Sequence, residues 1–288
     1  MLVVFEQHAW LLPVGLFSLG LVVGSFLNVV IYRLPLMMES RWRRDCCELL
    51  EVAQEKQETP LNLATPNSHC PICKSAIKPW QNIPVISYLL LRGKCGSCGA
   101  HIALRYPIME FITGLMTLAL ACFIAPSWAL FGAVLFTWAL ITLTMIDIDH
   151  QLLPDDITLP LLWLGLLFNV GDTYVSLQEA VLGAMAGYLA LWSIYWIFKL
   201  LTGKEGMGYG DFKLLAALGA WLGWQALPVI ILLSSLVGAV CGIALMSIKR
   251  RGREIPIPFG PYLAMAGWIA LLWGDELIAR YLGNGGGA

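Results

Sequence analysis

Long runs of apolar residues without any charge make up most of the chain, and short polar segments separate them. A membrane-spanning helix needs about 20 predominantly apolar residues. Runs 111–146 and 214–248 can each hold two such helices, and Pro126 and Pro228 near their middles predict the turns. The pattern predicts eight spans, of which the fourth and sixth are short: 10–32, 108–125, 128–146, 156–171, 179–199, 212–226, 229–248 and 257–275.

The composition indicates an all-α polytopic membrane protein. Hydrophobic residues account for 58% and charged residues for only 13%, whereas soluble domains are about 25% charged. The net charge of −1 argues against a nucleic-acid partner and leaves the lipid bilayer as the expected surroundings.

The distribution of Lys and Arg predicts how the chain crosses the membrane. Ten of the 18 basic residues lie between Arg33 and Arg105, and most others lie in 199–213 and 249–253. Basic segments accumulate on the cytoplasmic side, which places the amino terminus outside, in the periplasm of a bacterium. The first apolar run, 9–32, has no basic segment before it and no small-residue cleavage site after it, so we expect a retained span.

A polar insert at residues 34–107 interrupts the apolar pattern after the first span. It contains two C-x-x-C knuckles, Cys70-Pro-Ile-Cys73 and Cys95-Gly-Ser-Cys98. Four thiolates in this pattern predict a zinc ribbon. Disulfides or free thiols are the alternatives, and a reducing cytoplasm disfavours disulfides. A closed four-thiolate site leaves no open position, so we expect structural zinc.

Asp147 and Asp211 are the candidate catalytic residues. Each ends or begins an apolar run, and an ionisable group at membrane depth is costly enough to indicate function. The two are 64 residues apart with two predicted spans between them, which places them at the same membrane face. Two carboxyl groups that share a water can hydrolyse a peptide bond, one as base and one as acid. Asp149 competes with Asp147, and the residues alone leave that choice open.

Glycines precede the second carboxylate as Gly206-x-Gly208-x-Gly210-Asp211. We expect these glycines to permit positive φ and close approach of the backbone to a substrate. The spacing differs from a dinucleotide-binding fingerprint. The alternative is a flexible turn that ends in a capping aspartate. The acidic pair 155–156 is predicted to cap the next span.

Together these motifs resemble those of the type IV prepilin leader peptidase family, and the resemblance covers nearly the whole chain. The segments that carry it are 24–35 (GSFLNVVIYRLP), the four cysteines, 105–110 (RYPIME), 146–155 (IDIDHQLLPD) and 206–211 (GMGYGD).

The resemblance implies a bifunctional enzyme of the bacterial inner membrane. Family members cleave the leader of prepilins or type II secretion pseudopilins at the cytoplasmic face, between Gly and Phe, and matching the motifs assigns the aspartates to Asp147 and Asp211. Members with the cysteine insert then methylate the new amino terminus with S-adenosylmethionine. The resemblance suggests Gly93, Lys94 and Glu110 for that cofactor. It divides the chain into a first span (1–33), the insert (34–107) and the peptidase domain (108–288).

Two other classes of function compete with a peptidase. Membrane carboxylates also relay protons in transporters, but transporters usually show internal repeats and none is visible here. A non-enzymatic anchor whose zinc ribbon recruits a partner is the third possibility. The sequence does not reveal which pilin or pseudopilin is the substrate, nor the oligomeric state.

Overall fold

The structure is a computed structural model that describes residues 10–52, 61–249 and 258–281. Within these ranges the chain is helical, and β-type pairing is limited to two isolated bridges. Among the described residues, six helices are long and apolar enough to cross a membrane. The long helices are α2 (Leu11–Leu49), α4 (Arg105–Phe123), α5 (Trp128–His150), α6 (Asp155–Asn169), α7 (Leu177–Thr202), α8 (Tyr209–Leu222), α9 (Leu227–Lys249) and α10 (Gly260–Tyr281); the short ones are η1 (Pro79–Asn82), α3 (Ile86–Leu90) and η2 (Trp224–Ala226).

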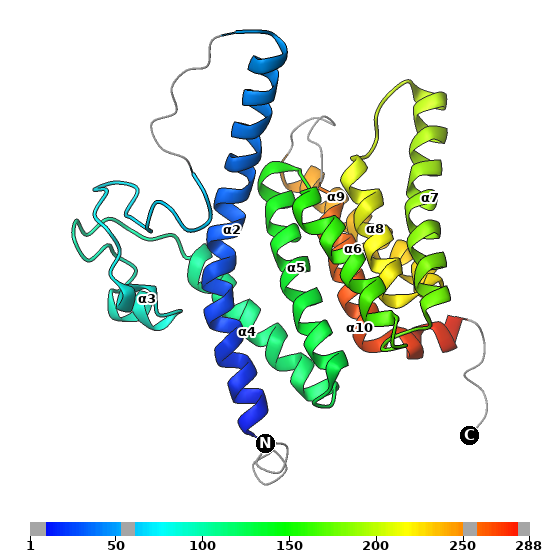
Figure 1. Ribbon diagram of the computed structural model, residues 1–288, viewed down its shortest axis with the longest axis horizontal. Coiled ribbons are helices and arrows are strands. Elements are labelled where there is room, and N and C mark those ends of the chain that lie inside the picture. Colours follow the sequence, from blue (N-terminus) through cyan, green and yellow to red (C-terminus); the bar gives the residue numbers. More distant parts are fainter. Residues whose placement is uncertain (1–9, 53–60, 250–257, 282–288) are drawn as a thin grey trace. The chain divides into compact units, whose positions relative to one another are not determined.

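The first compact unit, Met1–Phe123, is built on the antiparallel pair α2 and α4 (Figure 1). Gly20 and Gly24 allow the two backbones to approach closely. A Cβ at Gly20 would stand 2.7 Å from the Thr117 hydroxyl oxygen, and one at Gly24 would stand 2.8 Å from the Glu110 Cα. Small residues four apart are a common device for packing membrane helices, where dispersion contacts replace the hydrophobic effect.

Helix α2 extends well beyond the predicted first span. We predicted an end near residue 32, whereas the helix continues through Pro35 to Leu49, into the polar insert. The prediction was wrong because residues 36–49 contain Leu, Met, Glu and Arg, which favour helix, and no glycine. A proline removes one backbone hydrogen bond, but the helix can continue through it when the residues before and after the proline favour helix.

The second unit, Ile124–Ala288, surrounds the short helix α8 with α6, α7, α9 and α10, and α5 packs on α10 and α6 (Figure 1). Most of α8 is buried, including Phe212 and every residue from Leu214 to Trp221. A helix that is apolar on all sides is stable only when other helices enclose it. This explains why a helix of 14 residues lies at the centre of the unit.

Close packing around α8 depends on two glycines of α7. A Cβ at Gly187 would stand 2.6 Å from the Leu215 carbonyl oxygen, and one at Gly183 would clash with the carbonyl oxygen of Gly219. On the α6 side, the Trp221 indole donates to the Leu161 carbonyl at 2.7 Å. These contacts bring backbone against backbone, which fixes the position of α8 and of the residues at its start.

Each of the eight predicted spans falls on a helix, but the two short ones, α6 and α8, are not among the six described helices that are long and apolar enough to cross a membrane. Apart from α2, the helix ends differ from the predicted ones by a few residues. Helix α5 continues to His150 and α8 begins at Tyr209, so both candidate aspartates lie inside helices. The turn after α8 is made by Gly223, with φ of +79°, and not by Pro228. Pro228 lies in the first turn of α9, where a missing N–H costs nothing.

Candidate functional site

Asp147 lies in the last turn of α5 and is only 5% exposed. Asp149 and His150, in the same turn, are exposed. Residues two apart on a helix point about 200° away from each other, so only one of the two aspartates can face the interior of the bundle. The structure thus distinguishes two carboxylates that the sequence left as competitors.

The Asp147 carboxylate meets the start of α10. Its Oδ2 accepts a hydrogen bond from the Gly260 N–H at 3.0 Å. A Cβ at residue 260 would stand 2.6 Å from the same oxygen, so glycine is the residue that lets the carboxylate reach this N–H. The N-terminus of a helix carries unpaired N–H groups and a partial positive charge, both of which stabilise an anion.

Asp211 lies in the first turn of α8 and is 7% exposed. Its backbone N–H donates to the Gly208 carbonyl at 3.2 Å. Its side-chain Oδ1 is buried and has no hydrogen-bond partner among the described residues. The Asp211 carboxyl group is close enough to Asp147 for the two to interact electrostatically. The fold therefore brings together the two predicted carboxylates, one from α5 and one from α8.

An ion pair joins the segments that follow the two aspartates. The Lys213 ammonium lies 2.7 Å from Asp155 Oδ2, so the second turn of α8 is tied to the first turn of α6. We predicted that 155–156 would cap a helix starting near Ile157. The helix instead begins at Asp155 after Pro154, without a side-chain cap, because acidic residues also stabilise the first turn through the helix dipole.

The three glycines before Asp211 do not adopt positive φ, so that part of the prediction was wrong. Close approach accounts for Gly210, because a Cβ there would stand 2.7 Å from the Cβ of Leu153. Gly208 is the N-cap of α8 and faces the Asp211 carboxylate. Gly206 packs on the ring of Phe198. Contact of these glycines with a substrate stays a prediction.

The four predicted cysteines converge in the first unit. The sulfurs of Cys70, Cys73, Cys95 and Cys98 all lie within 4.8 Å of one another. Cys70 and Cys98 are 3.9 Å apart, and Cys73 and Cys95 are 4.0 Å apart. Zinc–sulfur bonds of about 2.3 Å in a tetrahedron require sulfurs roughly 3.8 Å apart, whereas a disulfide requires about 2.05 Å. The cluster therefore fits a metal ion and not a pair of disulfides.

Each knuckle is folded by its own backbone hydrogen bonds. The Cys70 N–H donates to the Ser75 carbonyl at 3.0 Å, and the Cys95 N–H donates to the Ala100 carbonyl at 2.7 Å. The Ser75 hydroxyl, 2.9 Å from the Cys73 sulfur, lowers the pKa of the Cys73 thiol to about 6. Backbone hydrogen bonds from Cys98 and Ser97 lower the pKa of the Cys95 thiol. Thiolates are the form that binds zinc.

The residues suggested for S-adenosylmethionine are engaged in the fold of the insert. Gly93 has φ of +67° and donates to the Tyr88 carbonyl at 2.9 Å. Lys94 forms an isolated bridge with His101 beside the second knuckle. The Glu110 carboxylate, on α4, accepts the Val85 N–H at 2.8 Å. These contacts fit a structural role, and a cofactor role for the three residues stays a prediction.

Comparison with known proteins identifies the family. The model named Bacterial Peptidase A24 N-terminal domain matches residues 18–124, and the model named Type IV leader peptidase family matches residues 134–243. A prepilin leader peptidase/N-methyltransferase of Aeromonas hydrophila is 57% identical over 276 residues, which cover 96% of this chain and 95% of the relative. The chain belongs to the type IV leader peptidase family. The resemblance drawn from the motifs is confirmed.

Other members of the family show the same extent of similarity. A prepilin leader peptidase/N-methyltransferase of Stutzerimonas stutzeri is 56% identical over 92% of this chain and 91% of its own length. One of Legionella pneumophila is 48% identical over 94% of each chain. No solved structure gives a significant match. Family membership and the helical bundle establish a multi-pass membrane protein of a peptidase family and oppose the transporter and anchor alternatives.

Sequence reasoning missed two contributors to the site. Gly260 lies outside the stretch matched by the leader peptidase family model, and no spacing in the sequence relates it to Asp147. The one available signal was the run Pro258-Phe259-Gly260-Pro261 at the start of the last span, where a glycine between helix-breaking residues indicates a tight backbone. The pairing of Lys213 with Asp155 was also missed, because the two residues are 58 positions apart in the sequence and no motif relates them.

Proposed function

We propose that this chain removes the leader peptide of type IV prepilins or type II secretion pseudopilins by aspartyl hydrolysis and then N-methylates the new terminus. The observation that carries the proposal is that two buried carboxyl groups, Asp147 and Asp211, lie near enough to interact electrostatically at one end of an apolar helix bundle. Relatives that span nearly the whole chain carry the name prepilin leader peptidase/N-methyltransferase. Burying two acidic side chains in the membrane costs free energy, so their presence indicates a function. Aspartyl hydrolysis of a peptide bond is a function that requires two carboxyl groups.

The surroundings of the two aspartates assign them different roles. Asp147 accepts a backbone hydrogen bond at the N-terminus of α10, an arrangement that stabilises its charged form. Asp211 has a buried oxygen without a described partner beside another carboxylate, where the neutral form avoids an unpaired buried charge. Asp147 is therefore the base, and Asp211 is the acid.

Hydrolysis then proceeds without a covalent intermediate on the enzyme. Asp147 removes a proton from water as the water oxygen attacks the scissile carbonyl carbon, and Asp211 donates its proton to the carbonyl oxygen. The carbon–nitrogen bond breaks as the proton held by Asp147 passes to the leaving amine. The carbonyl re-forms when its oxygen returns a proton to Asp211. Both carboxyl groups end in the state in which they began.

Zinc in the cysteine cluster has a structural role in this proposal. Cys70, Cys73, Cys95 and Cys98 would occupy all four positions of a tetrahedral ion, which stabilises the folded insert when bound and leaves no position for a reacting water. The insert is also held by Arg33 of α2, whose guanidinium donates to the carbonyl oxygens of residues 62, 63 and 66. The ion and Arg33 together would hold a segment with little core of its own.

The methyltransferase activity rests on the names of the relatives and on the presence of the cysteine insert. S-adenosylmethionine would supply the methyl group. Gly93, Lys94 and Glu110 stay the candidates for its site, although the described contacts of these residues serve the fold of the insert, so no step of the transfer is assigned to them. The functional division into 1–33, 34–107 and 108–288 stays part of the proposal.

The charge distribution supports the location of the active site. Basic residues surround the second Asp motif, at 199–213, and precede the last predicted span, at 249–253, and such residues favour the cytoplasmic side of a bacterial inner membrane. The catalytic aspartates would then act at the cytoplasmic face, where a leader is first accessible. The amino terminus would be periplasmic.

The test is to incubate purified protein in liposomes with a prepilin precursor, with and without S-adenosylmethionine, and to weigh the product. Asp147→Asn and Asp211→Asn should each reduce the cleavage rate by about 10²- to 10⁴-fold or more, the contribution of a general acid or base. Asp149→Asn, in the exposed position of the same turn, is the matched control. Wild-type rates in either of the first two variants would refute the peptidase assignment. Cleavage without a mass gain from the methyl donor would remove the second activity.

A further inference from the structure

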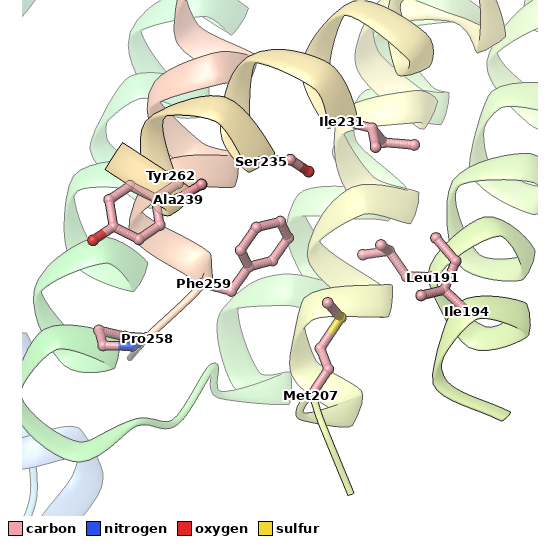
Figure 2. A pocket seen from close by; sticks show the side chains of 10 residues that line it. Leu191, Ile194, Met207, Ile231, Ser235, Ala239, Pro258, Phe259 and Tyr262 are labelled. Carbon is pink, nitrogen blue, oxygen red and sulfur yellow. The ribbon is translucent and has the colours of Figure 1, made fainter. Parts of the chain in front are cut away.

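A groove of about 340 Å³ lies beside the candidate active site in the second unit (Figure 2). Its walls come from α7, the segment before α8, α9 and the start of α10. The residues that line it include Leu191, Met207, Ser235, Ala239, Phe259 and Tyr262. In Figure 2 the Phe259 ring lies in the middle of the lining, with Met207 toward one end and Ile231 toward the other.

The lining of the groove selects apolar ligands. Ser235 and Tyr262 are its polar side chains, and no charged residue contributes to it. Phe259 and Met207 offer an aromatic ring and a polarizable thioether, which adapt to aliphatic and aromatic partners. Because three of its walls belong to membrane-spanning helices, an occupant must also be stable at membrane depth.

Two lining residues are direct chain neighbours of the groups that hold the catalytic aspartates. Phe259 precedes Gly260, whose N–H donates to Asp147 at 3.0 Å. Met207 precedes Gly208, whose carbonyl accepts the Asp211 N–H at 3.2 Å. The lining therefore includes the chain neighbours of both backbone groups that contact the aspartates, so a segment bound in the groove would lie close to the candidate active site.

The size of the groove limits what can enter it. The lining residues of α9 run from Ile231 to Ala239, a distance of roughly 12 Å at 1.5 Å per residue. An extended peptide covers this length with about four residues. The volume is at the low end for ligand pockets, which begin near 300 Å³, so the groove accommodates a few side chains and not a whole helix.

We propose that this groove holds the first apolar side chains that follow the scissile bond of the substrate. The inference rests on the proposed peptidase function and adds the part of the substrate that the enzyme recognises. The groove lies between α7, α9 and α10, which are apolar candidate membrane spans, whereas a polar leader would stay at the membrane face. The segment after the bond is thus the one that can reach the groove.

The test fills the groove and measures substrate affinity. Ala239→Phe should raise KM for a prepilin precursor by about 10- to 100-fold, the effect of losing one buried apolar side chain, with little change in kcat. Val240→Phe is the matched control, because Val240 is the next residue of α9, is 60% exposed and is outside the lining. An unchanged KM in Ala239→Phe would overturn the proposal.

A second substrate separates recognition from misfolding. A precursor whose first four residues after the bond are Ala should bind wild type weakly and should lose little further affinity in Ala239→Phe. Equal losses on both precursors would show that the variant acts through the fold and would reject the groove. Ile194→Ala, which widens the groove, should improve cleavage of a precursor with Trp among these positions, and no improvement would count against the proposal. Absence of any cleavage by wild type would instead refute the peptidase function itself.

Discussion

Gly260→Ala tests how the working position of Asp147 is held. The added Cβ would stand 2.6 Å from Asp147 Oδ2 and 3.2 Å from its Cγ, so the carboxylate must move away. The movement breaks the hydrogen bond from the residue 260 N–H, which is 3.0 Å long in the wild type. A small substitution on α10 should therefore impair the chemistry performed by a residue of α5.

The size of the effect follows from the bond that is lost. A hydrogen bond to a charged group contributes about 1.5–3 kcal/mol, which corresponds to a decrease in rate of about 10- to 150-fold. Displacing a catalytic group by about 1 Å costs on the order of 100-fold by itself. We therefore expect kcat for precursor cleavage to fall by about 10- to 100-fold, with KM little changed because the substrate groove is intact.

Steady-state cleavage of a prepilin precursor in liposomes provides the measurement, and thermal unfolding in detergent verifies that the variant is folded. Gly274→Ala is the matched control: it lies in the same helix, and a Cβ there meets nothing within 4 Å. Wild-type kcat in Gly260→Ala, or an equal loss in Gly274→Ala, would refute the reasoning that this N–H positions the base.

Three further predictions concern the parts that support the site. Cys73→Ser should lower the zinc content of the purified protein and make the insert sensitive to proteolysis, whereas Cys46→Ser, outside the cluster, should change neither; equal metal content in the two would contradict the site. Asn169→Leu removes a buried amide that donates to two backbone carbonyls of α8 and accepts from two backbone N–H groups, so we expect a loss of about 3 kcal/mol or more, seen as a lower melting temperature. Lys213→Met breaks a half-exposed ion pair with Asp155 and should cost only about 0.2–1 kcal/mol; a larger loss of stability, or one insensitive to salt, would show that the pair does more than join two helix ends.

Local chemistry explains which predictions succeeded. The apolar runs predicted the long helices because membrane helices need length and composition more than specific partners. The C-x-x-C pairs predicted the metal cluster because each knuckle is a short local turn, and the structure brings their sulfurs within 4.8 Å of one another. Asp147 and Asp211 stood out because a carboxylate beside an apolar run is rare. Each of these signals is contained in a few neighbouring residues.

Long-range packing decided the rest. Whether Asp147 or Asp149 faces the interior depends on the rotation of α5 against the bundle, and it is Asp147 that is buried and accepts the Gly260 N–H of α10. Gly260 supports Asp147 across 113 residues of chain, and the groove needs α7, α9 and α10 to lie around Phe259. Helix α2 continued past Pro35 where local rules favoured a break. These features depend on contacts between residues that are far apart in the sequence. They are therefore determined only when the helices pack together in the folded chain.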